Sequence, residues 1–225
     1  MHTFQDRRNL AAPGGRPTCA RCLRPQSHCL CARIPSLDSR TRLLVLQHPD
    51  EARHALNTAR LAVLGLRNAS LHVGTRYDPR LWRIDGYQAR LLFPGPEAEV
   101  LQAQAGDAAP TLLVVPDGTW RQARQLLAGN PELAALPRVT VPADTVSRYR
   151  VRHVALPRAL ATIEAVAAAL GALEAPRSFE ALLAPFEALV AGQIEAMGRA
   201  RYERHHVRRE GSRMARRSGA SGEGG

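Results

Sequence analysis

The sequence predicts an α/β fold in which a mostly parallel sheet is flanked by helices. Residues 111–115 form a short run of apolar and β-branched side chains, which is typical of a strand buried on both faces. Such segments alternate along the chain with segments of helical character, the pattern expected of parallel strands joined by crossover helices. The chain has 225 residues, 45% of them hydrophobic, which is enough for one sizeable core.

Further strands are expected on either side of this one, because the same apolar pattern recurs in short segments. They cover residues 41–47, 69–73, 90–93 and 138–141. The residues that follow the strands are rich in Pro, Gly and polar side chains, which favour turns. No internal repeat is visible.

The helices are predicted from their start signals and from apolar periodicity. The first covers about 50–63, and a second begins at Pro96, a favoured residue for the first helical position, with acidic residues following. A third covers 120–128, with Thr119 as its N-cap. The Ala-rich segment 160–173 is the fourth. Residues 178–204 form a longer helix that Pro185 either kinks or divides in two.

Composition divides the chain into four parts. Residues 1–17 are a flexible polar lead-in, and 18–35 hold all the cysteines and form a small knuckle. The α/β domain covers 36–204. Residues 205–225 contain Arg, Gly, Ser and Glu without apolar periodicity, which predicts a disordered basic tail.

The charge of the chain points to an anionic polymer as its partner. The formal net charge is +11, and because Lys is absent all 31 basic side chains are Arg, whose guanidinium fork suits phosphate. No apolar run reaches the length of about 18 residues that a membrane span needs. The N-terminus also lacks the apolar stretch of a signal peptide, so we expect a cytoplasmic protein with no membrane contact.

The cysteines favour a structural zinc site. Cys19, Cys22, Cys29 and Cys31 fall within thirteen residues, spaced Cys-x2-Cys-x6-Cys-x-Cys. In a cytosolic chain this clustering favours a closed tetrahedral zinc knuckle with four thiolate ligands over two disulfides, although the last pair is spaced more tightly than usual. His28 is expected to be a bystander. The alternative is a set of free or redox-active thiols.

A carboxylate and an indole follow the most apolar strand. Asp117 lies in the turn between Pro116 and Gly118, and Trp120 opens the next helix. The carboxyl ends of parallel strands are where open α/β sheets bind their ligands. These two residues are therefore the leading candidates for a site, with a polar turn and a packed Trp as the alternative.

Polar residues also follow the strand 41–47. His48 either contacts a ligand or bonds to the backbone, and Asp50 is expected to cap the next helix. On that helix, Thr58 and Arg60 either reach a cofactor or lie on a solvated face. The segment Ser147–Arg152 places Arg148, Arg150 and Arg152 around Tyr149, a combination suited to phosphate contacts and base stacking.

These motifs occur in a recognisable order. His-Pro-x-Glu at 48–51 is followed by Leu-Phe-Pro at 92–94, Asp-Gly-Thr-Trp at 117–120, Arg-Tyr-Arg at 148–150 and Thr-Ile-Glu-Ala at 162–165. In this order they resemble the DTW-domain proteins, and the cysteine cluster resembles bacterial members of that family. The resemblance extends from Thr18 to Val190. One departure is Ala161 before Thr162, where many members have Ser.

The resemblance implies both a fold and an activity. DTW-domain proteins are S-adenosylmethionine-dependent transferases that place a 3-amino-3-carboxypropyl group on N3 of a tRNA uridine and release methylthioadenosine. They are related to the SPOUT-like superfamily, so a knotted domain is expected. The implied cofactor-binding residues are His48, Thr58, Leu92, Phe93, Pro94, Pro116, Asp117, Gly118, Thr119, Trp120, Thr162 and Glu164.

Chemical roles follow for the strand-end residues. N3 of uridine is a weak acid, so Asp117 is the candidate general base or the group that orients the uracil. Trp120 stacks on the base or faces the positively charged sulfonium. Arg148 or Arg150 holds the cofactor carboxylate or a tRNA phosphate.

Two other classes of function remain open at this point. One is a SPOUT-like tRNA or rRNA methyltransferase, which attacks a different carbon of the same sulfonium. The other is a non-catalytic, zinc-containing RNA-binding module. Asp117 beside Trp120 argues against the second, because a surface that only binds RNA has no use for a carboxylate facing an anionic partner.

Overall fold

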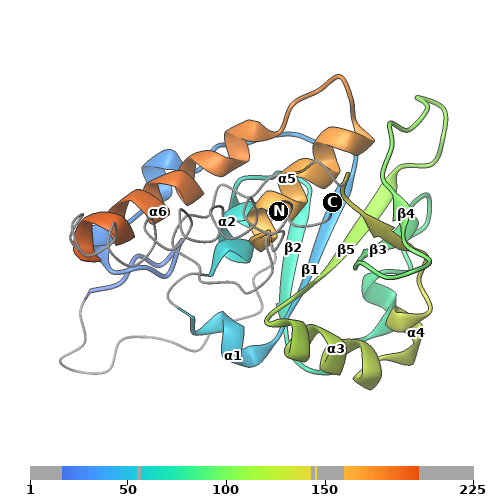
Figure 1. Ribbon diagram of the computed structural model, residues 1–225, viewed down its shortest axis with the longest axis horizontal. Helices are drawn as coiled ribbons and strands as arrows, with labels where there is room; N and C mark the ends of the chain where they lie inside the picture. The colour runs from blue at the N-terminus through green and yellow to red at the C-terminus, as the bar shows by residue number, and fades with distance from the viewer. Residues whose placement is uncertain (1–16, 55–56, 143–144, 146–159, 198–225) are drawn as a thin grey trace, which may run out of the picture.

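A computed structural model describes residues 17–54, 57–142, 145 and 160–197 of the chain (Figure 1). Within this part, six strands form one parallel sheet in the order β2-β1-β5-β3-β6-β4. The strands are β1 (Arg42–Gln47), β2 (Ala69–Val73), β3 (Gln88–Leu92), β4 (Glu99–Val100), β5 (Thr111–Asp117) and β6 (Arg138–Thr140). The α/β class and the parallel sheet are confirmed.

Helices cover both faces of this sheet. They are α1 (Pro49–Ala52), α2 (Thr58–Leu64), α3 (Trp120–Gly129), α4 (Pro131–Ala134), α5 (Thr162–Leu173) and α6 (Ala184–Met197). Short 3-10 turns occur at Gln26–His28, Cys31–Arg33, Pro79–Leu81 and Glu180–Leu183. No helix in the described part of the chain is both long and apolar enough to cross a membrane.

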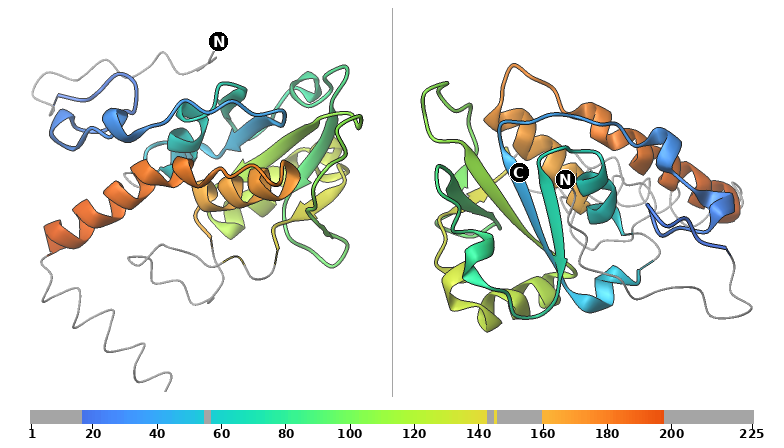
Figure 2. Two further views of the ribbon diagram at one scale, coloured as in Figure 1. Left: turned by 90° about the horizontal axis from the view of Figure 1, so that it is seen from above. Right: turned by 180° about the vertical axis from the view of Figure 1, so that it is seen from behind.

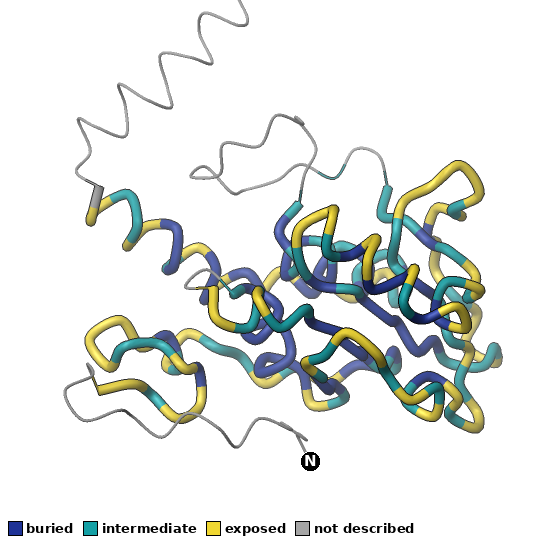
Figure 3. Tube along the Cα trace, turned by 90° about the horizontal axis from the view of Figure 1, so that it is seen from below, coloured by how far each residue is buried: buried dark blue, intermediate teal, exposed yellow. Residues whose placement is uncertain are grey.

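Alternation along the strands builds two cores. Successive strand residues point to opposite faces, so Leu113 and Val115 pack with α2, α5 and α6, while Leu112 and Val114 pack with α3 and α4. Figures 1 and 2 show these two groups of helices on opposite sides of the strands. Figure 3, which colours each residue by its burial, shows that the strands are buried and that the covering helices expose their outer sides.

The central strands end together at one edge of the sheet. Gln47, the last residue of β1, lies opposite both Asp117 at the end of β5 and Val73 at the end of β2. The chain leaves this edge into α1 after β1 and into α3 after β5 (Figure 1). We call it the carboxyl edge. It is where open parallel sheets place their ligands.

Several predicted elements are confirmed closely. The strand at 69–73 is found with the predicted bounds, and the strand at 111–115 continues two residues further, to Asp117. The helix predicted at 120–128 is α3, and Thr119 is its N-cap. α4 was not predicted, because its single turn is too short for a periodic signal.

The prediction of a single helix at 50–63 is wrong. The structure has two helices there, α1 and α2, and each has its own cap. The side chain of His48 accepts a hydrogen bond from the backbone N–H of Asp50 and caps α1, so Asp50 is not the cap. Asn57 accepts from the N–H of Arg60 and starts α2.

The helix predicted to begin at Pro96 is also wrong. Residues 95–98 form a turn in which the N–H of Ala98 donates to the carbonyl of Gly95. Glu99 and Val100 are then strand β4, which pairs with Val139 and Thr140 of β6. The hydrogen bonds gained by pairing with β6, an edge strand, outweigh the local preference for a helix start, because the segment has few apolar side chains with which a helix could pack.

Towards the C-terminus, Pro185 marks the division of the predicted long helix. The structure has a 3-10 turn at Glu180–Leu183 and then α6, with Pro185 in its first turn, where the missing N–H costs no helical hydrogen bond. Residues 198–204 of that helix, the predicted tail at 205–225 and almost all of the lead-in at 1–17 lie outside the described residues.

Candidate functional site

Asp117 is the centre of a buried hydrogen-bond network at the carboxyl edge. Its side chain is only 4% exposed. Gln47 Nε2 donates to Oδ2 at 2.7 Å, and Thr162 Oγ1 donates to Oδ1 at 2.5 Å. Donors on both oxygens fix the orientation of the carboxyl group. The structure therefore holds an oriented carboxylate where β1, β5 and α5 meet.

A second amide extends the network from Gln47 to α2. Gln47 Nε2 donates to Asn57 Oδ1 at 3.1 Å, and Asn57 Nδ2 donates back to Gln47 Oε1 at 3.2 Å. The bond from Gln47 Nε2 to Asp117 and the bond from the N–H of Arg60 to Asn57 Oδ1 fix which end of each amide faces which partner. Neither Gln47 nor Asn57 was among the site residues predicted from the sequence. The available signal was a polar residue closing an otherwise apolar strand.

His48 forms hydrogen bonds with the backbone through its ring and its own N–H. Its Nδ1 accepts from the N–H of Asp50 at 3.3 Å, and its own backbone N–H donates to the carbonyl of Asp117 at 2.9 Å. The backbone contact expected as one alternative for His48 is present, and the contact of its ring with a ligand stays a prediction. When the ring is neutral, an acceptor role for Nδ1 places the proton on Nε2.

Gly118 and Thr119 shape the turn between Asp117 and α3. Gly118 has a φ of +152°, and a Cβ there would lie 3.0 Å from Gln122 Cβ and 3.4 Å from His48 Cβ. Thr119 Oγ1 accepts from the N–H of Gln122 at 3.3 Å, and Gln122 Oε1 accepts from the N–H of Thr119 at 2.7 Å. This capping box fixes the start of α3.

Trp120 projects outward next to the buried carboxylate. Its side chain is 44% exposed, although Trp is usually well covered. Its ring meets the ring of Phe93 edge to face, with centroids 5.6 Å apart and planes at 67°. The guanidinium carbon of Arg138 lies 5.8 Å from the Phe93 centroid. Two elements, the end of β3 and the start of α3, thus supply a half-exposed aromatic pair.

The start of α5 contacts Asp117 through Thr162. Glu164 is 5% exposed, and its Oε2 accepts from the N–H of Ala161 at 2.8 Å. Ala161 has no side-chain acceptor, so the return bond of a full capping box is missing. Thr162, the first residue of α5, donates its hydroxyl to Asp117, which gives the Thr-Ile-Glu segment a structural role beyond the helix start.

Tyr77 supports the site from the loop after β2. Its hydroxyl lies 2.7 Å from the carbonyl of Gly74 and 2.9 Å from the carbonyl of Gln47, so it ties this loop to the end of β1. Burial, with a smaller contribution from the negative charge of Asp117, raises the pKa of Tyr77 above its usual value. Tyr77 was not predicted to be a site residue, because no local sequence pattern marks it.

The other predicted residues divide into those the structure places and those it does not describe. Thr58 and Arg60 are both buried, so the solvated-face alternative is wrong for them. Leu92 is half-buried at the end of β3, and Pro94 after it is exposed. Pro116 lies opposite Leu46 of β1, one step from the edge. Arg148, Tyr149, Arg150 and Arg152 lie outside the described residues.

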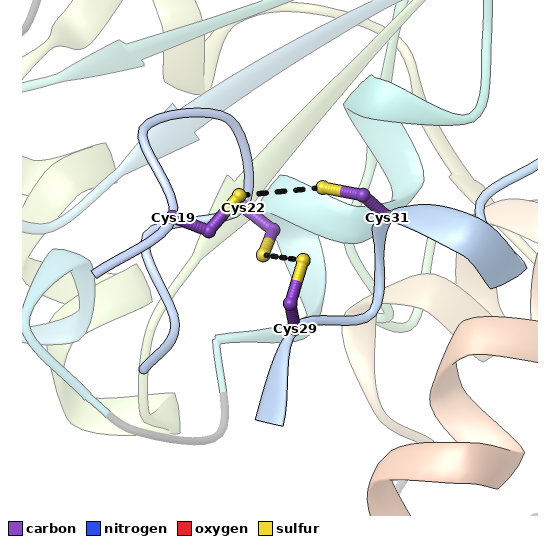
Figure 4. Close-up of side chains that lie close together, drawn as sticks. All are labelled: Cys19, Cys22, Cys29 and Cys31. Carbon is purple, nitrogen blue, oxygen red and sulfur yellow. Dashed lines mark hydrogen bonds between the residues drawn. The ribbon is translucent and has the colours of Figure 1, made fainter. Parts of the chain in front are cut away.

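The four cysteines converge on one point (Figure 4). All four Sγ atoms lie within 4.8 Å of one another, with Cys19 and Cys31 at 3.6 Å and Cys22 and Cys29 at 3.8 Å. None of the four forms a disulfide. Four ligands at a Zn–S distance of about 2.3 Å would be about 3.8 Å apart in a tetrahedron. The thiols are thus arranged as a metal site requires, and His28 is not in this group.

The surroundings of the cluster act on its thiols in opposite directions. Backbone N–H groups of Cys22 and Arg21 donate to Cys19 and lower the pKa of that thiol to about 6. Burial raises the pKa of Cys31 to about 12. The neighbouring Leu30 is buried in the same core as α6, so the cysteine segment is anchored to the domain.

Comparison with known proteins places this geometry in a family. The profile of the DTW domain matches residues 16–194. A Macaca fascicularis protein named tRNA-uridine aminocarboxypropyltransferase 2 is 33% identical over 208 residues, covering 87% of this chain and 70% of that protein. A Drosophila melanogaster protein of the same name is 32% identical over 194 residues, covering 81% of this chain and 77% of its own.

A plant protein shows the same relationship at a greater distance. The Arabidopsis thaliana tRNA-uridine aminocarboxypropyltransferase A is 28% identical over 193 residues, covering 71% of this chain and 73% of its own. No solved structure matches the chain at the level of significance that these relatives reach. The ordered motifs, the buried carboxylate and the matched profile agree: the chain belongs to the DTW-domain family.

Proposed function

We propose that this protein is a tRNA-uridine aminocarboxypropyltransferase with S-adenosylmethionine as the donor. The observation that carries the proposal is Asp117, an oriented carboxylate next to the exposed Trp120, in a chain whose relatives bear that enzyme name. When bound, S-adenosylmethionine supplies an alkyl carbon on a positively charged sulfur that leaves as a neutral thioether. N3 of the uridine forms the new C–N bond at Cγ, the C–S bond breaks, and the N3 proton is released.

Asp117 is the group to which we assign the N3 proton. Its carboxylate either accepts the proton or fixes the uracil while solvent accepts it. Gln47 and Thr162 hold both oxygens, which supports precise orientation. The two roles differ in their response to pH, which allows them to be separated experimentally.

We assign the remaining residues at the carboxyl edge to shaping the site and to binding the tRNA and the donor. Gly118 lets the turn pack closely against Gln122 and His48, because a Cβ there would lie 3.0 Å from Gln122 Cβ. We assign Trp120 to stacking on the target base, since its ring is half-exposed rather than enclosed. The predicted contacts of Arg148, Tyr149, Arg150 and Arg152 with phosphate or with the donor carboxylate remain part of this proposal.

We further propose that Cys19, Cys22, Cys29 and Cys31 hold one structural zinc ion. Support comes from the convergent thiols and from their spacing, which fits a tetrahedron. Four protein ligands fill the coordination shell, so we assign the metal no part in the chemistry. The reduced cysteines and a tRNA substrate are consistent with the cytoplasmic location predicted from the sequence.

The test is incubation of the protein with bulk tRNA and S-adenosylmethionine, followed by nucleoside mass spectrometry. An aminocarboxypropyl adduct on uridine, with methylthioadenosine formed in equal amount, is the expected result. Its mass increment is about seven times that of a methyl group, so a methyltransferase is distinguished directly. Binding without any adduct would indicate a non-catalytic RNA-binding module and would overturn the proposal.

A further inference from the structure

We propose that the outer face of α3, together with Arg138, binds the backbone phosphates of the tRNA segment that carries the target uridine. This inference rests on the proposed function and adds to it a docking surface for the substrate. We call this surface the α3 surface and define it by Trp120, Arg121, Arg124 and Arg138.

The first argument is the division of α3 into two faces. Ala123, Leu126 and Leu127 are buried against the sheet. The exposed residues are Trp120, Arg121, Arg124, Gln125 and Ala128, and the helix contains no acidic residue. Arg121 and Arg124 are three positions apart, so their side chains lie on the same side of the helix. The outer face of α3 is therefore basic along its first two turns.

The second argument is that the basic and aromatic groups form one continuous array. Arg124 Nε donates to the carbonyl of Trp120 at 3.3 Å, which holds its guanidinium over the first turn. Trp120 contacts Phe93, and Arg138 lies over the Phe93 ring of this pair. Gly95 leaves space for Arg138, since a Cβ there would lie 3.3 Å from Nη1.

The third argument is the lack of an internal counter-ion. The ion pairs in the described part of the chain join His48 to Asp50, Arg83 to Glu132 and Arg177 to Glu174. None of these involves Arg121, Arg124 or Arg138. Guanidinium groups without a carboxylate partner are suited to bidentate contacts with phosphate oxygens.

The position of the surface indicates which part of the RNA it meets. α3 starts at Trp120, directly after the turn of Asp117, Gly118 and Thr119, so its first turn borders the end of β5 that carries Asp117 (Figure 1). A solvated basic helix is common by itself. Here the same turn also exposes Trp120, and base stacking beside phosphate contacts is how single-stranded nucleic acid is bound.

The test uses the full-length protein and unmodified tRNA. The affinity is measured by equilibrium binding over a range of salt concentrations for the wild type and for the double variant Arg121→Gln/Arg124→Gln. Each lost phosphate contact should reduce the slope of log affinity against log salt by about 0.7–0.9, so the double variant should lose about 1.5 in slope. Arg138→Gln should remove a further contact.

The matched control removes the same charge at the opposite end of the molecule. Arg67 lies just before the start of β2. Arg177 lies just after α5, close to Glu174, whose side chain accepts a hydrogen bond from the N–H of Thr41 before β1. Both residues are therefore near the amino ends of the strands, whereas α3 starts at their carboxyl ends. Both arginines are exposed. The double variant Arg67→Gln/Arg177→Gln should keep the wild-type salt slope. If both double variants reduce the slope equally, the effect is one of net charge and the α3 surface is not a docking site.

Turnover separates this inference from the proposed function. If the wild type modifies tRNA, Arg121→Gln/Arg124→Gln should raise KM for tRNA about tenfold and lower kcat much less, because these side chains do not reach the reacting atoms. An unchanged KM and slope would overturn the α3 surface while leaving the enzyme assignment intact. A wild-type protein that neither binds nor modifies tRNA would instead overturn the proposed function. Unaltered thermal melting verifies that the variants fold.

Discussion

The hydroxyl of Thr162 donates a hydrogen bond to the carboxylate of Asp117, across 45 positions in the chain. This contact joins the first turn of α5 to the end of β5. Gln47 binds the other oxygen of the same carboxylate from β1. The orientation of Asp117 therefore depends on three separate elements.

Replacing Thr162 with Val tests the structural contribution of this contact. The change keeps the shape and removes one donor from a buried carboxylate, so the free energy of unfolding should fall by about 1–3 kcal/mol. Denaturant unfolding measures it. Thr111→Val at the start of β5 is the matched control, because the Thr111 hydroxyl is buried with no hydrogen-bond partner among the described residues. That variant should be neutral or more stable, and equal losses in both would contradict the assigned role of Thr162.

Replacing Asp117 with Asn tests its chemical role. Turnover should fall by about 10²–10⁴-fold if Asp117 accepts the N3 proton, while donor affinity changes little. If Asp117 only orients the uracil, raising the pH should partly restore turnover in the Asn variant. Steady-state kinetics across pH, with thermal melting to detect misfolding, distinguish the two. Near-normal turnover at neutral pH would remove Asp117 from the mechanism and make Glu164 or His48 the next candidate.

Replacing Trp120 tests the stacking contact with the base. Trp120→Ala should weaken tRNA binding by about 1–3 kcal/mol, whereas Trp120→Phe should retain much of the affinity because a stacking face remains. Folding should be little affected, since the side chain is 44% exposed. Binding assays with tRNA and with the donor compare the two ligands. A loss confined to donor affinity would assign Trp120 to the sulfonium instead.

The cysteine cluster should contain about one zinc ion per chain, measurable by elemental analysis. Cys19→Ser should lose the metal, loosen the N-terminal segment and weaken tRNA binding more than donor binding. His28→Ala is the control and should retain zinc, because His28 lies outside the group of converging ligands. Acidification should release the metal, since protons compete for the thiolates. Purified protein without zinc, with all four thiols reacting freely, would contradict the site.

Deleting the chain after Val207 should reduce the salt dependence of tRNA binding without abolishing catalysis. The deleted residues include Arg208 and Arg209 and show no apolar periodicity that could contribute to a core. Binding at several salt concentrations and turnover at saturating tRNA measure the two effects. A complete loss of turnover would mean that this segment forms part of the site.

The sequence was sufficient for features that depend on local signals. The apolar run at 111–115 predicted a strand because a segment buried on both faces must be apolar throughout, and β5 is that strand. Thr119 predicted the start of α3 because its hydroxyl can cap a helix within its own turn. The spacing of Cys19, Cys22, Cys29 and Cys31 predicted a common site because few residues separate them.

Tertiary structure decided the features that depend on distant partners. Residues 99–100 became a strand because β6 offered an open edge, a fact absent from their own sequence. Gln47 and Tyr77 joined the site because parallel pairing brings the ends of β1, β2 and β5 together. The local pattern identified Asp117 as a candidate, but its orientation follows from donors on β1 and α5. Those contacts form only when the sheet and helices pack, because hydrogen bonds between residues far apart in sequence require a folded core to hold them in place.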